Sequence, residues 1–401
     1  MSASRRLHGL AGLTLAQVLA SAAAGLILTV SGPAATVIAG SQSVAGWGQT
    51  SAIIGAASLS VPVAGLASRR GRRASLVTAF FFAAVGAGVA AAGAATHALA
   101  LFLFGLAGVG AGTVAALALR YAAADMAETS AARPRKVAIV LASATLGSLI
   151  GPNLVAVVGG QDRPSIPFVV VAVLYGCAAL VAAQLRMPRV GEVLAEGSAQ
   201  TQPTPRAAAA GPAATVIPIA VLAAGHMAMI ALMGMAPVHL QHVGVGGAGV
   251  GAVMSAHLVA MYAASPVFGV LVRRVGSGAA GVVGLVLGSM ACGILILAGE
   301  DLVGFGVGLA CLGLAWSIGM VSSSVALSNV ARSSRLRAQG RGDLVLNVGG
   351  GLASAVAGLT VAALGYERLA FVAAAVLALV AAGVTVALIV VRRYAPSRTM
   401  V

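Results

Sequence analysis

Three long stretches of the chain contain no acidic or basic residue. Residues 7–68, 74–119 and 207–272 lack Asp, Glu, Lys and Arg entirely. A helix that spans a membrane needs about 20 consecutive apolar residues, so each stretch has room for two spans joined by a turn. Only 8% of the residues are charged, whereas a soluble domain uses roughly a quarter to cover its surface. We therefore expect lipid, and not water, to surround this chain.

Six shorter uncharged stretches each fit one further span. They are residues 137–161, 164–185, 275–299, 302–331, 344–366 and 369–391. Together with the three pairs, they predict an all-α membrane protein with twelve transmembrane helices. All nine acidic residues then fall in loops or at helix ends, so we expect no span to carry a central carboxylate.

The net charge of +15 comes from short basic loops between the spans. Basic residues precede the first span and follow every second span, whereas only Arg163 and Arg368 fall on the opposite side. Because cytoplasmic loops are rich in Lys and Arg, both termini are expected in the cytoplasm. No basic face or row of stacking aromatics accompanies the charge, so we expect no nucleic-acid partner.

One polar segment divides the chain. Residues 188–212 are rich in Gln, Thr, Pro and Ala and predict a flexible cytoplasmic linker. We expect a six-helix bundle over residues 1–187 and a second six-helix bundle over residues 213–401.

A short basic turn occurs once in each half. At a constant offset of 205 residues, Leu66, Arg69 and Gly71 align with Leu271, Arg274 and Gly276. A turn that recurs half a chain later is typical of a duplicated transporter.

The first copy, from Ala64 to Arg73, resembles the signature between helices 2 and 3 of the major facilitator superfamily. The resemblance implies two six-helix bundles that rock to expose a central site to either side. It also implies a cytoplasmic gate, in which the family uses an Asp where this chain has Ser68. We expect Arg72 or Arg73 to pair with Asp125 in its place. The candidate gate residues are Arg69, Gly71, Arg72, Arg73, Asp125, Arg274 and Gly276.

The fifth predicted span contains Gly147, Gly151 and Pro152 in the pattern Gly-x3-Gly-Pro. This pattern is similar to a signature of drug–proton antiporters. Its physical meaning is more general, because glycines four residues apart form a groove for close packing and proline kinks a helix. We expect these residues to serve helix packing, with proton-coupled drug efflux as an alternative function that the missing carboxylates disfavour.

Half of the 12 methionines lie within residues 227–261. Helical spacing forms two stripes there, namely His226, Met229 and Met233, and Met254, His257 and Met261. Thioether and imidazole groups are soft ligands that suit copper, especially Cu(I), and reject Mg²⁺ and Ca²⁺. Two other readings stay open. Methionine also fills irregular gaps between helices, and a histidine inside a span can carry a coupling proton.

Met229 and His257 are both expected about 12–15 Å below the outer membrane surface, because a helix rises about 1.5 Å per residue. Met229-x3-Met233 with His257-x3-Met261 resembles the paired motifs of the CcoA-like copper importers. The resemblance implies that these four residues bind copper. His226 and Met254 are secondary candidates. His239 and His242 form either an outer capture point or plain loop residues.

These observations predict a copper importer of the bacterial inner membrane, which by resemblance supports cytochrome oxidase assembly. Copper, as the ion or a chelate, is the expected substrate, and the lipid bilayer is the expected surrounding. Riboflavin or related small-molecule uptake is an alternative, because another branch of the family takes up riboflavin, although the scarcity of aromatic residues counts against it. We expect a monomer that has no cofactor. It is not expected to be an enzyme, because the chain has no nucleotide-binding loop or hydrolytic constellation.

Overall fold

The structure, a computed structural model, is built of α-helices. It describes residues 2–41, 44, 47–158, 164–185, 187, 213–245, 247–330 and 332–394, and these residues include no β-strand. The chain divides into two compact units. Unit 1 comprises Met1–Val190 and Asp343–Gly351, and unit 2 comprises Gly191–Gly342 and Leu352–Val401. The expected linker, residues 188–212, lies outside the described residues.

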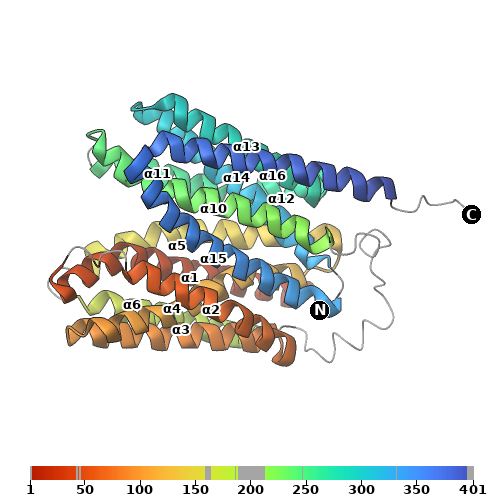
Figure 1. Ribbon diagram of the computed structural model, residues 1–401. Coiled ribbons are helices and arrows are strands. Elements are labelled where there is room, and N and C mark those ends of the chain that lie inside the picture. Colours follow the sequence, from red (N-terminus) through yellow and green to blue (C-terminus); the bar gives the residue numbers. More distant parts are fainter. Residues whose placement is uncertain are drawn as a thin grey trace, which may run out of the picture. The chain divides into compact units, whose positions relative to one another are not determined.

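Unit 1 is built on the first six long helices of the described chain. Their bounds are α1 Ser2–Ala39, α2 Trp47–Arg70, α3 Arg72–Ala95, α4 Leu99–Asp125, α5 Arg133–Val158 and α6 Ile166–Gln184. Figure 1 shows these helices side by side, in red to yellow-green. Their shared core consists mainly of buried Ala, Leu, Val and Phe side chains. Small side chains allow helices to approach closely, which is how apolar helices associate in lipid.

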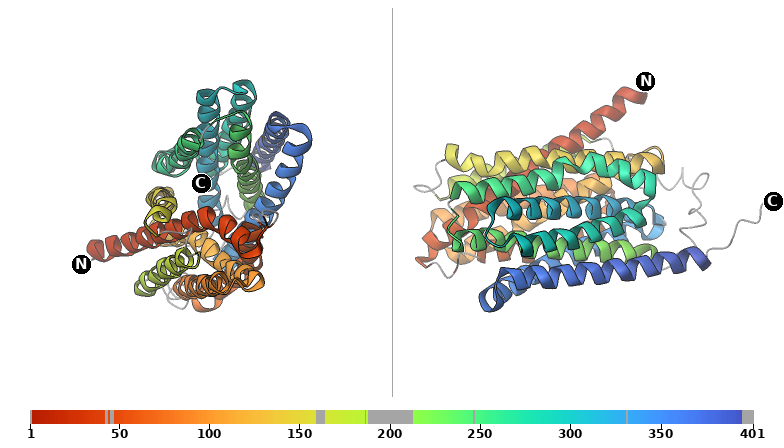
Figure 2. Two further views of the ribbon diagram at one scale, coloured as in Figure 1. Left: turned by 90° about the vertical axis from the view of Figure 1, so that its left-hand side faces the viewer. Right: turned by 90° about the horizontal axis from the view of Figure 1, so that it is seen from above.

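Unit 2 contains the later helices. Their bounds are α10 Ala213–His242, α11 Gly247–Ala263, α12 Ser265–Val275, α13 Ser277–Ala298, α14 Leu302–Ser328, α15 Arg332–Leu364 and α16 Tyr366–Tyr394. Figure 2 shows this group, in green to blue, from two further directions. Both α10 and α11 pack against α14, as does α13. Buried residues of α10, α13, α14 and α16 form most of the core of this unit.

Ten helices of the described residues are long and apolar enough to cross a membrane. α11 and α12 meet at a bend of 42° and together form an eleventh span. Pro266 in the first turn of α12 explains the bend, because proline has no backbone N–H to continue the helical hydrogen bonds. α5 occupies the place of the remaining expected span, residues 137–161. The predicted fold class is confirmed, and each expected span has a helical counterpart.

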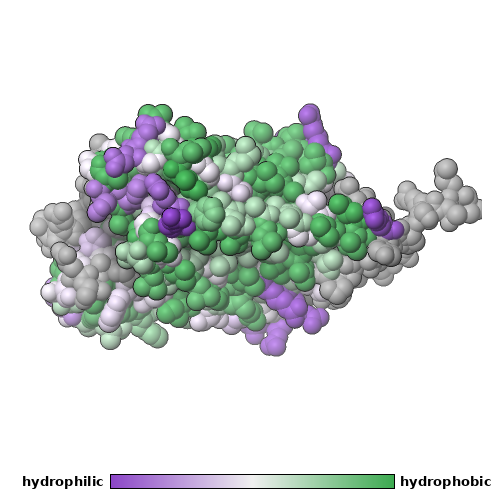
Figure 3. All heavy atoms as spheres, turned by 45° about the horizontal axis from the view of Figure 1, so that its top comes forward, coloured by the Kyte–Doolittle hydropathy of each residue, from purple (hydrophilic) through white to green (hydrophobic). Residues whose placement is uncertain are grey.

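The surface of the described residues is largely apolar. Large hydrophobic side chains such as Phe104, Leu297 and Leu379 are exposed. Figure 3 shows a wide hydrophobic area on which hydrophilic side chains form small separate groups. An exposed apolar surface of this extent requires a lipid environment.

The repeated basic turns share one backbone conformation. Gly71 separates α2 from α3 with φ 87° and ψ 162°, and Gly276 separates α12 from α13 with φ 86° and ψ 157°. Side chains larger than hydrogen are strained in this region, which is essentially reserved for glycine. The aligned glycines of the two halves are therefore required by the turn itself.

Gly147 and Gly151 bring α5 against α1. A Cβ atom on Gly147 would lie 2.3 Å from the carbonyl oxygen of Val18, and one on Gly151 would lie 2.4 Å from that of Ala22. Both distances are far below van der Waals contact, so only glycine fits at either position. The packing groove expected from the sequence is present. The side chain of Pro152 lies outside the described residues.

α15 differs from its expected span in two ways. The helix begins at Arg332, well before residue 344, so Asp343 lies inside the helix and inside the apolar span Ser334–Leu364. In addition, its segment Asp343–Gly351 belongs to unit 1, although it lies within residues 213–401. The expectation that all acidic residues fall in loops or at helix ends is therefore wrong for Asp343.

Candidate functional site

His257 of α11 is completely buried and only half satisfied. Its Nδ1 atom lies 2.7 Å from the backbone carbonyl oxygen of Leu309 on α14. A carbonyl oxygen only accepts hydrogen bonds, so Nδ1 carries the ring proton and Nε2 presents a lone pair. Nε2 is buried and has no hydrogen-bonding partner in the described part of the chain. Backbone carbonyls fix the imidazole tautomer of metal-binding histidines in the same way.

The methionines of the two stripes have different environments. Met229 and Met261 are buried, and Met233 is half-buried. The backbones of His257 and Met261 lie against Gly313 of α14, where a Cβ atom would come within 3.2 Å of both residues. The stripe on α11 therefore lies against α14 at this level. No contact that the structure describes joins Met229 or Met233 to His257, so the assembled site stays a prediction.

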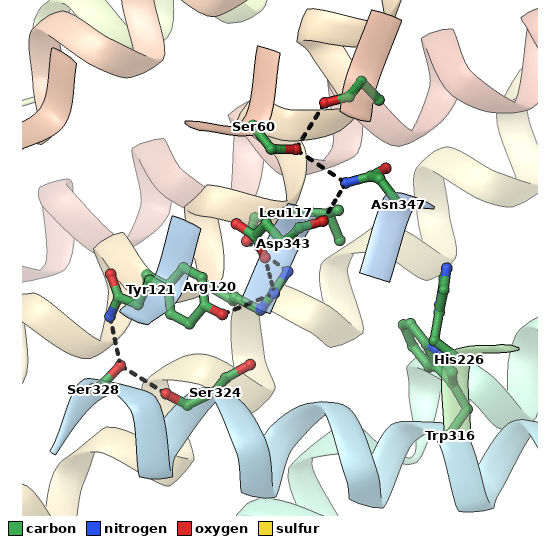
Figure 4. A network of polar contacts seen from close by, with 12 residues as sticks. Ser60, Leu117, Arg120, Tyr121, His226, Trp316, Ser324, Ser328, Asp343 and Asn347 are labelled. Carbon is green, nitrogen blue, oxygen red and sulfur yellow. Dashed lines mark hydrogen bonds and ion pairs between the residues drawn. The ribbon is translucent and has the colours of Figure 1, made fainter. Parts of the chain in front are cut away.

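His226 has a different partner from the one expected. Its Nδ1 atom accepts a hydrogen bond of 3.1 Å from the indole Nε1 of Trp316 on α14, which requires its ring proton to lie on Nε2. The ring of Tyr262, on α11, meets Trp316 edge to face at 5.7 Å. The close-up in Figure 4 shows His226 beside Trp316. The structure thus places three aromatic rings from three helices of unit 2 together.

The remaining secondary candidates serve packing or face outward. Met254 packs against the hydrophobic core of unit 2. His239 stacks on Phe305 at 5.2 Å and on Tyr366 at 4.8 Å, and it belongs to α10 instead of a loop. His242, the last residue of α10, is exposed.

The predicted pairing of Arg72 with Asp125 is present. Nε and Nη2 of Arg72, at the start of α3, lie 2.9 and 2.7 Å from Oδ2 of Asp125 at the end of α4. Ser68 instead hydrogen-bonds the carbonyl oxygen of Gly65 in its own helix. Three further arginines of the candidate gate are exposed, namely Arg69, Arg73 and Arg274. The gating role of this pair stays a prediction.

A second ion pair, which the sequence did not reveal, lies in the interior of unit 1. Nη2 of Arg120, on α4, is 2.5 Å from Oδ1 of Asp343 on α15. The Arg120 side chain has no exposed surface, and that of Asp343 retains 6%. Two charges are removed from water at a high energetic cost, so they are retained only where they are paired or functional.

Tyr121 contacts both ion pairs of unit 1. Its hydroxyl oxygen lies 3.1 Å from Nη2 of Arg120, whose guanidinium lies 4.4 Å from the centre of the tyrosine ring. The guanidinium of Arg72 also lies over this ring, at 5.8 Å. Figure 4 shows Tyr121, Arg120 and Asp343 together. The buried pair and the Arg72–Asp125 pair are thus connected through one aromatic side chain.

Asn347 extends the buried network to α2. One turn after Asp343, its amide nitrogen donates to the carbonyl oxygen of Asp343 at 2.8 Å and to the hydroxyl oxygen of Ser60 at 3.4 Å. Ser60 in turn donates to the carbonyl oxygen of Ala56. Segment Asp343–Gly351 of α15 is therefore bonded to α2 as well as to α4.

Known proteins with a similar sequence are membrane transporters. YdeG and YddS of Bacillus subtilis (strain 168), both described as uncharacterized MFS-type transporters, are each 28% identical to this chain. The YdeG alignment covers 90% of this chain and 87% of YdeG, and the YddS alignment covers 92% and 87%.

Solved structures show the same fold. FucP in the outward conformation matches with a TM-score of 0.72 at 15% identity, over 95% of this chain and 99% of that one. The proton:xylose symporter XylE matches at 0.71 and 14%, over 99% and 97%. A bacterial homologue of the iron transporter ferroportin matches at 0.69 and 14%, over 94% and 98%. Residues 13–335 match the Major Facilitator Superfamily as a sequence family. The chain therefore belongs to the Major Facilitator Superfamily and is a multi-pass secondary transporter that works by alternating access.

Proposed function

We propose that this transporter carries copper into the bacterial cell, with Met229, Met233, His257 and Met261 as its ligands. The observation that carries the proposal is the buried Nε2 atom of His257, which has a lone pair and no described partner. A histidine used only for packing stabilises the fold most when both ring nitrogens form hydrogen bonds, because a buried nitrogen without a partner destabilises the protein. A soft cation that enters and leaves explains why one nitrogen is left unpaired.

The neighbouring side chains fit the same substrate. Met261 lies one turn after His257 and is buried, and Met229 is buried in α10. Thioether sulfur has no proton to lose and prefers soft metals, so these ligands favour copper over Mg²⁺ or Ca²⁺. The resemblance to CcoA-like importers extends the proposal to cytochrome oxidase assembly.

The membrane potential supplies a driving force for cation entry. With the inside negative, it favours inward movement by about 2.3 kcal/mol per charge per 100 mV. The one-sided arginines support an orientation in which both termini lie in the cytoplasm of a bacterial inner membrane.

Radiocopper uptake by cells with and without the protein tests the proposal. Met229→Leu conserves volume, so packing alone predicts normal uptake, whereas ligation predicts a severe loss at unchanged membrane abundance. Met227→Leu is the matched control, because Met227 lies on the same helix but is exposed. Normal uptake by Met229→Leu, or no uptake by the wild type above vector-only cells, would overturn the proposal.

Riboflavin or a related ring compound is a second candidate substrate. The grouping of His226, Trp316 and Tyr262 supports it, because aromatic rings stack on planar ligands. Labelled riboflavin uptake, measured in the same cells, separates the two substrates.

Proton-coupled drug efflux also gains one observation. Asp343 is a buried carboxylate inside a span, and no carboxylate of this kind was expected from the sequence. Resistance of expressing cells to cationic drugs tests this alternative.

A further inference from the structure

The Arg120–Asp343 pair has no part in the proposed copper site, yet it is the most deeply buried ion pair described in unit 1. Both residues lie within candidate membrane spans, Leu99–Asp125 and Ser334–Leu364. Ionisable side chains in such spans are expensive and usually mark an ion or proton pathway. We propose that Asp343 binds and releases a proton during the transport cycle, with Arg120 as its counter-ion.

Arg120 does not form the full set of hydrogen bonds expected of an arginine that only holds a carboxylate in place. A clamp between arginine and a carboxylate is strongest when two parallel hydrogen bonds form. Here one nitrogen, Nη2, reaches Oδ1 of Asp343, while Nη1 binds the carbonyl oxygen of Leu117. Nε is buried and has no hydrogen-bonding partner among the described residues. Arg120 therefore keeps bonds to its own helix and to Tyr121 when the carboxylate is neutralised.

The chemistry of the pair assigns the proton to the carboxylate. Arginine stays protonated in proteins, so Asp343 is the member that can change charge. The charged and titratable groups around it are Arg120 and Tyr121 on α4 and Arg72 on α3, while α2 contributes the uncharged Ser60 through Asn347. The Asp343 side chain keeps 6% of its surface exposed, whereas that of Arg120 keeps none. A proton can thus reach the carboxylate without first exposing the guanidinium.

Protonation of Asp343 weakens the interaction that attaches α15 to α4. A proton from solution forms an O–H bond on Asp343, and the pair passes from neutral to one net positive charge. The bond to Arg120 is weakened, because the guanidinium keeps its charge but no longer faces a carboxylate of opposite charge. Segment Asp343–Gly351 is then held mainly by Asn347 and its neighbours. Loss of the proton restores the pair, so the same step runs in reverse at the end of a cycle.

Infrared difference spectroscopy of the full-length protein in lipid vesicles tests the proposal without any transported substrate. As the solution is acidified, the wild type is expected to show a growing carboxylic-acid band from the protonation of Asp343. Asp343→Asn should lose this band. Glu367→Gln should keep it, because Glu367 is an exposed carboxylate at the start of α16.

A wild type without a titrating band, or a band that persists in Asp343→Asn, would overturn the assignment. Where Asp343→Asn does not fold, Asp343→Glu decides, since it keeps a carboxyl group in a changed position. A shift in the frequency of the band supports Asp343 as its source, and an unshifted band assigns it elsewhere. These outcomes do not depend on copper, so the inference can fail or hold separately from the proposed substrate.

Discussion

Nη2 of Arg120 lies 2.5 Å from Oδ1 of Asp343, although 223 positions separate the two residues in the chain. The pair joins α4 to a segment of α15, and Asn347 joins the same segment to α2. Within unit 1, this network contains the buried charged side chains of Arg120 and Asp343 together with the buried polar side chains of Ser60 and Asn347. We therefore expect its members to affect both stability and transport, and different variants are needed to separate the two effects.

Removal of one partner of the buried pair should destabilise the protein strongly. Asp343→Ala leaves the charge of Arg120 buried and uncompensated, for which we expect a loss of about 3–5 kcal/mol. Asp125→Ala breaks a more exposed pair and should cost about 0–1 kcal/mol. Thermal unfolding in detergent measures both. The charge-swapped double variant Arg120→Asp with Asp343→Arg should recover part of the loss, and equal losses in the two single variants would contradict the difference in burial.

A proton gradient should act through Asp343. With the outer solution more acidic, wild-type vesicles are expected to take up radiocopper several-fold faster than without a gradient. Asp343→Asn removes the proton-binding group, so its uptake should no longer respond, while Glu367→Gln should respond as the wild type does. A gradient response that survives in Asp343→Asn would place the coupling proton on another group.

The Arg72–Asp125 pair should affect turnover more than stability. Asp125→Asn keeps the size of the side chain but loses the charge that attracts Arg72, so we expect a several-fold slower transport rate at near-normal abundance. Tyr121 contacts Arg72 as well as Arg120, and for this reason Tyr121→Phe should have a smaller effect of the same kind. Initial uptake rates at several copper concentrations provide the measurement. An unchanged rate in Asp125→Asn would exclude a gating role for this pair.

Much of the fold follows from local features of the sequence. Runs without charge predict the spans, and the glycines of the basic turns mark equivalent helix boundaries. Gly147 and Gly151 predicted close packing, and the structure supplies the partner helix, α1. Such features need only neighbouring residues, because they depend on hydrophobicity, backbone freedom and hydrogen bonding within a few positions.

The buried ion pair could not be found in the same way. A search for uncharged stretches ends at every charge, so it places Arg120 and Asp343 at the ends of spans by construction. Their burial inside helices depends on the ion pair between them, and the local sequence around either residue does not reveal a partner 223 positions away. One signal was available, because residues 114–124 are otherwise almost all small or apolar around Arg120. The partners of His226 and His239 were hidden for the same reason.

The glycines of the repeated turns should tolerate no side chain. Gly71→Ala and Gly276→Ala place a Cβ atom in a backbone region of positive φ, at a cost of about 1–3 kcal/mol each. Gly65→Ala is the matched control, because Gly65 lies within α2 and a Cβ atom there meets no neighbour. We expect lower membrane abundance and lower unfolding temperatures for the two turn variants only. Equal behaviour of all three would show that the turns adjust freely.

The last prediction separates ligation by His257 from its role in packing. Asparagine carries an amide N–H close to the position of the histidine Nδ1, so His257→Asn can keep the hydrogen bond to the carbonyl oxygen of Leu309. It places no donor atom at the position of Nε2. If the imidazole serves packing, this variant should fold and transport normally, apart from the small change in volume. If Nε2 binds copper, the variant should reach the membrane in normal amounts and lose radiocopper uptake. His239→Asn is the control, because His239 stacks on Phe305 and Tyr366. This variant is expected to lower the stability of the protein more than its rate of copper uptake. Uptake by His257→Asn at the wild-type rate would reject Nε2 as a ligand, and the aromatic group around Trp316 would then make a ring compound the leading substrate.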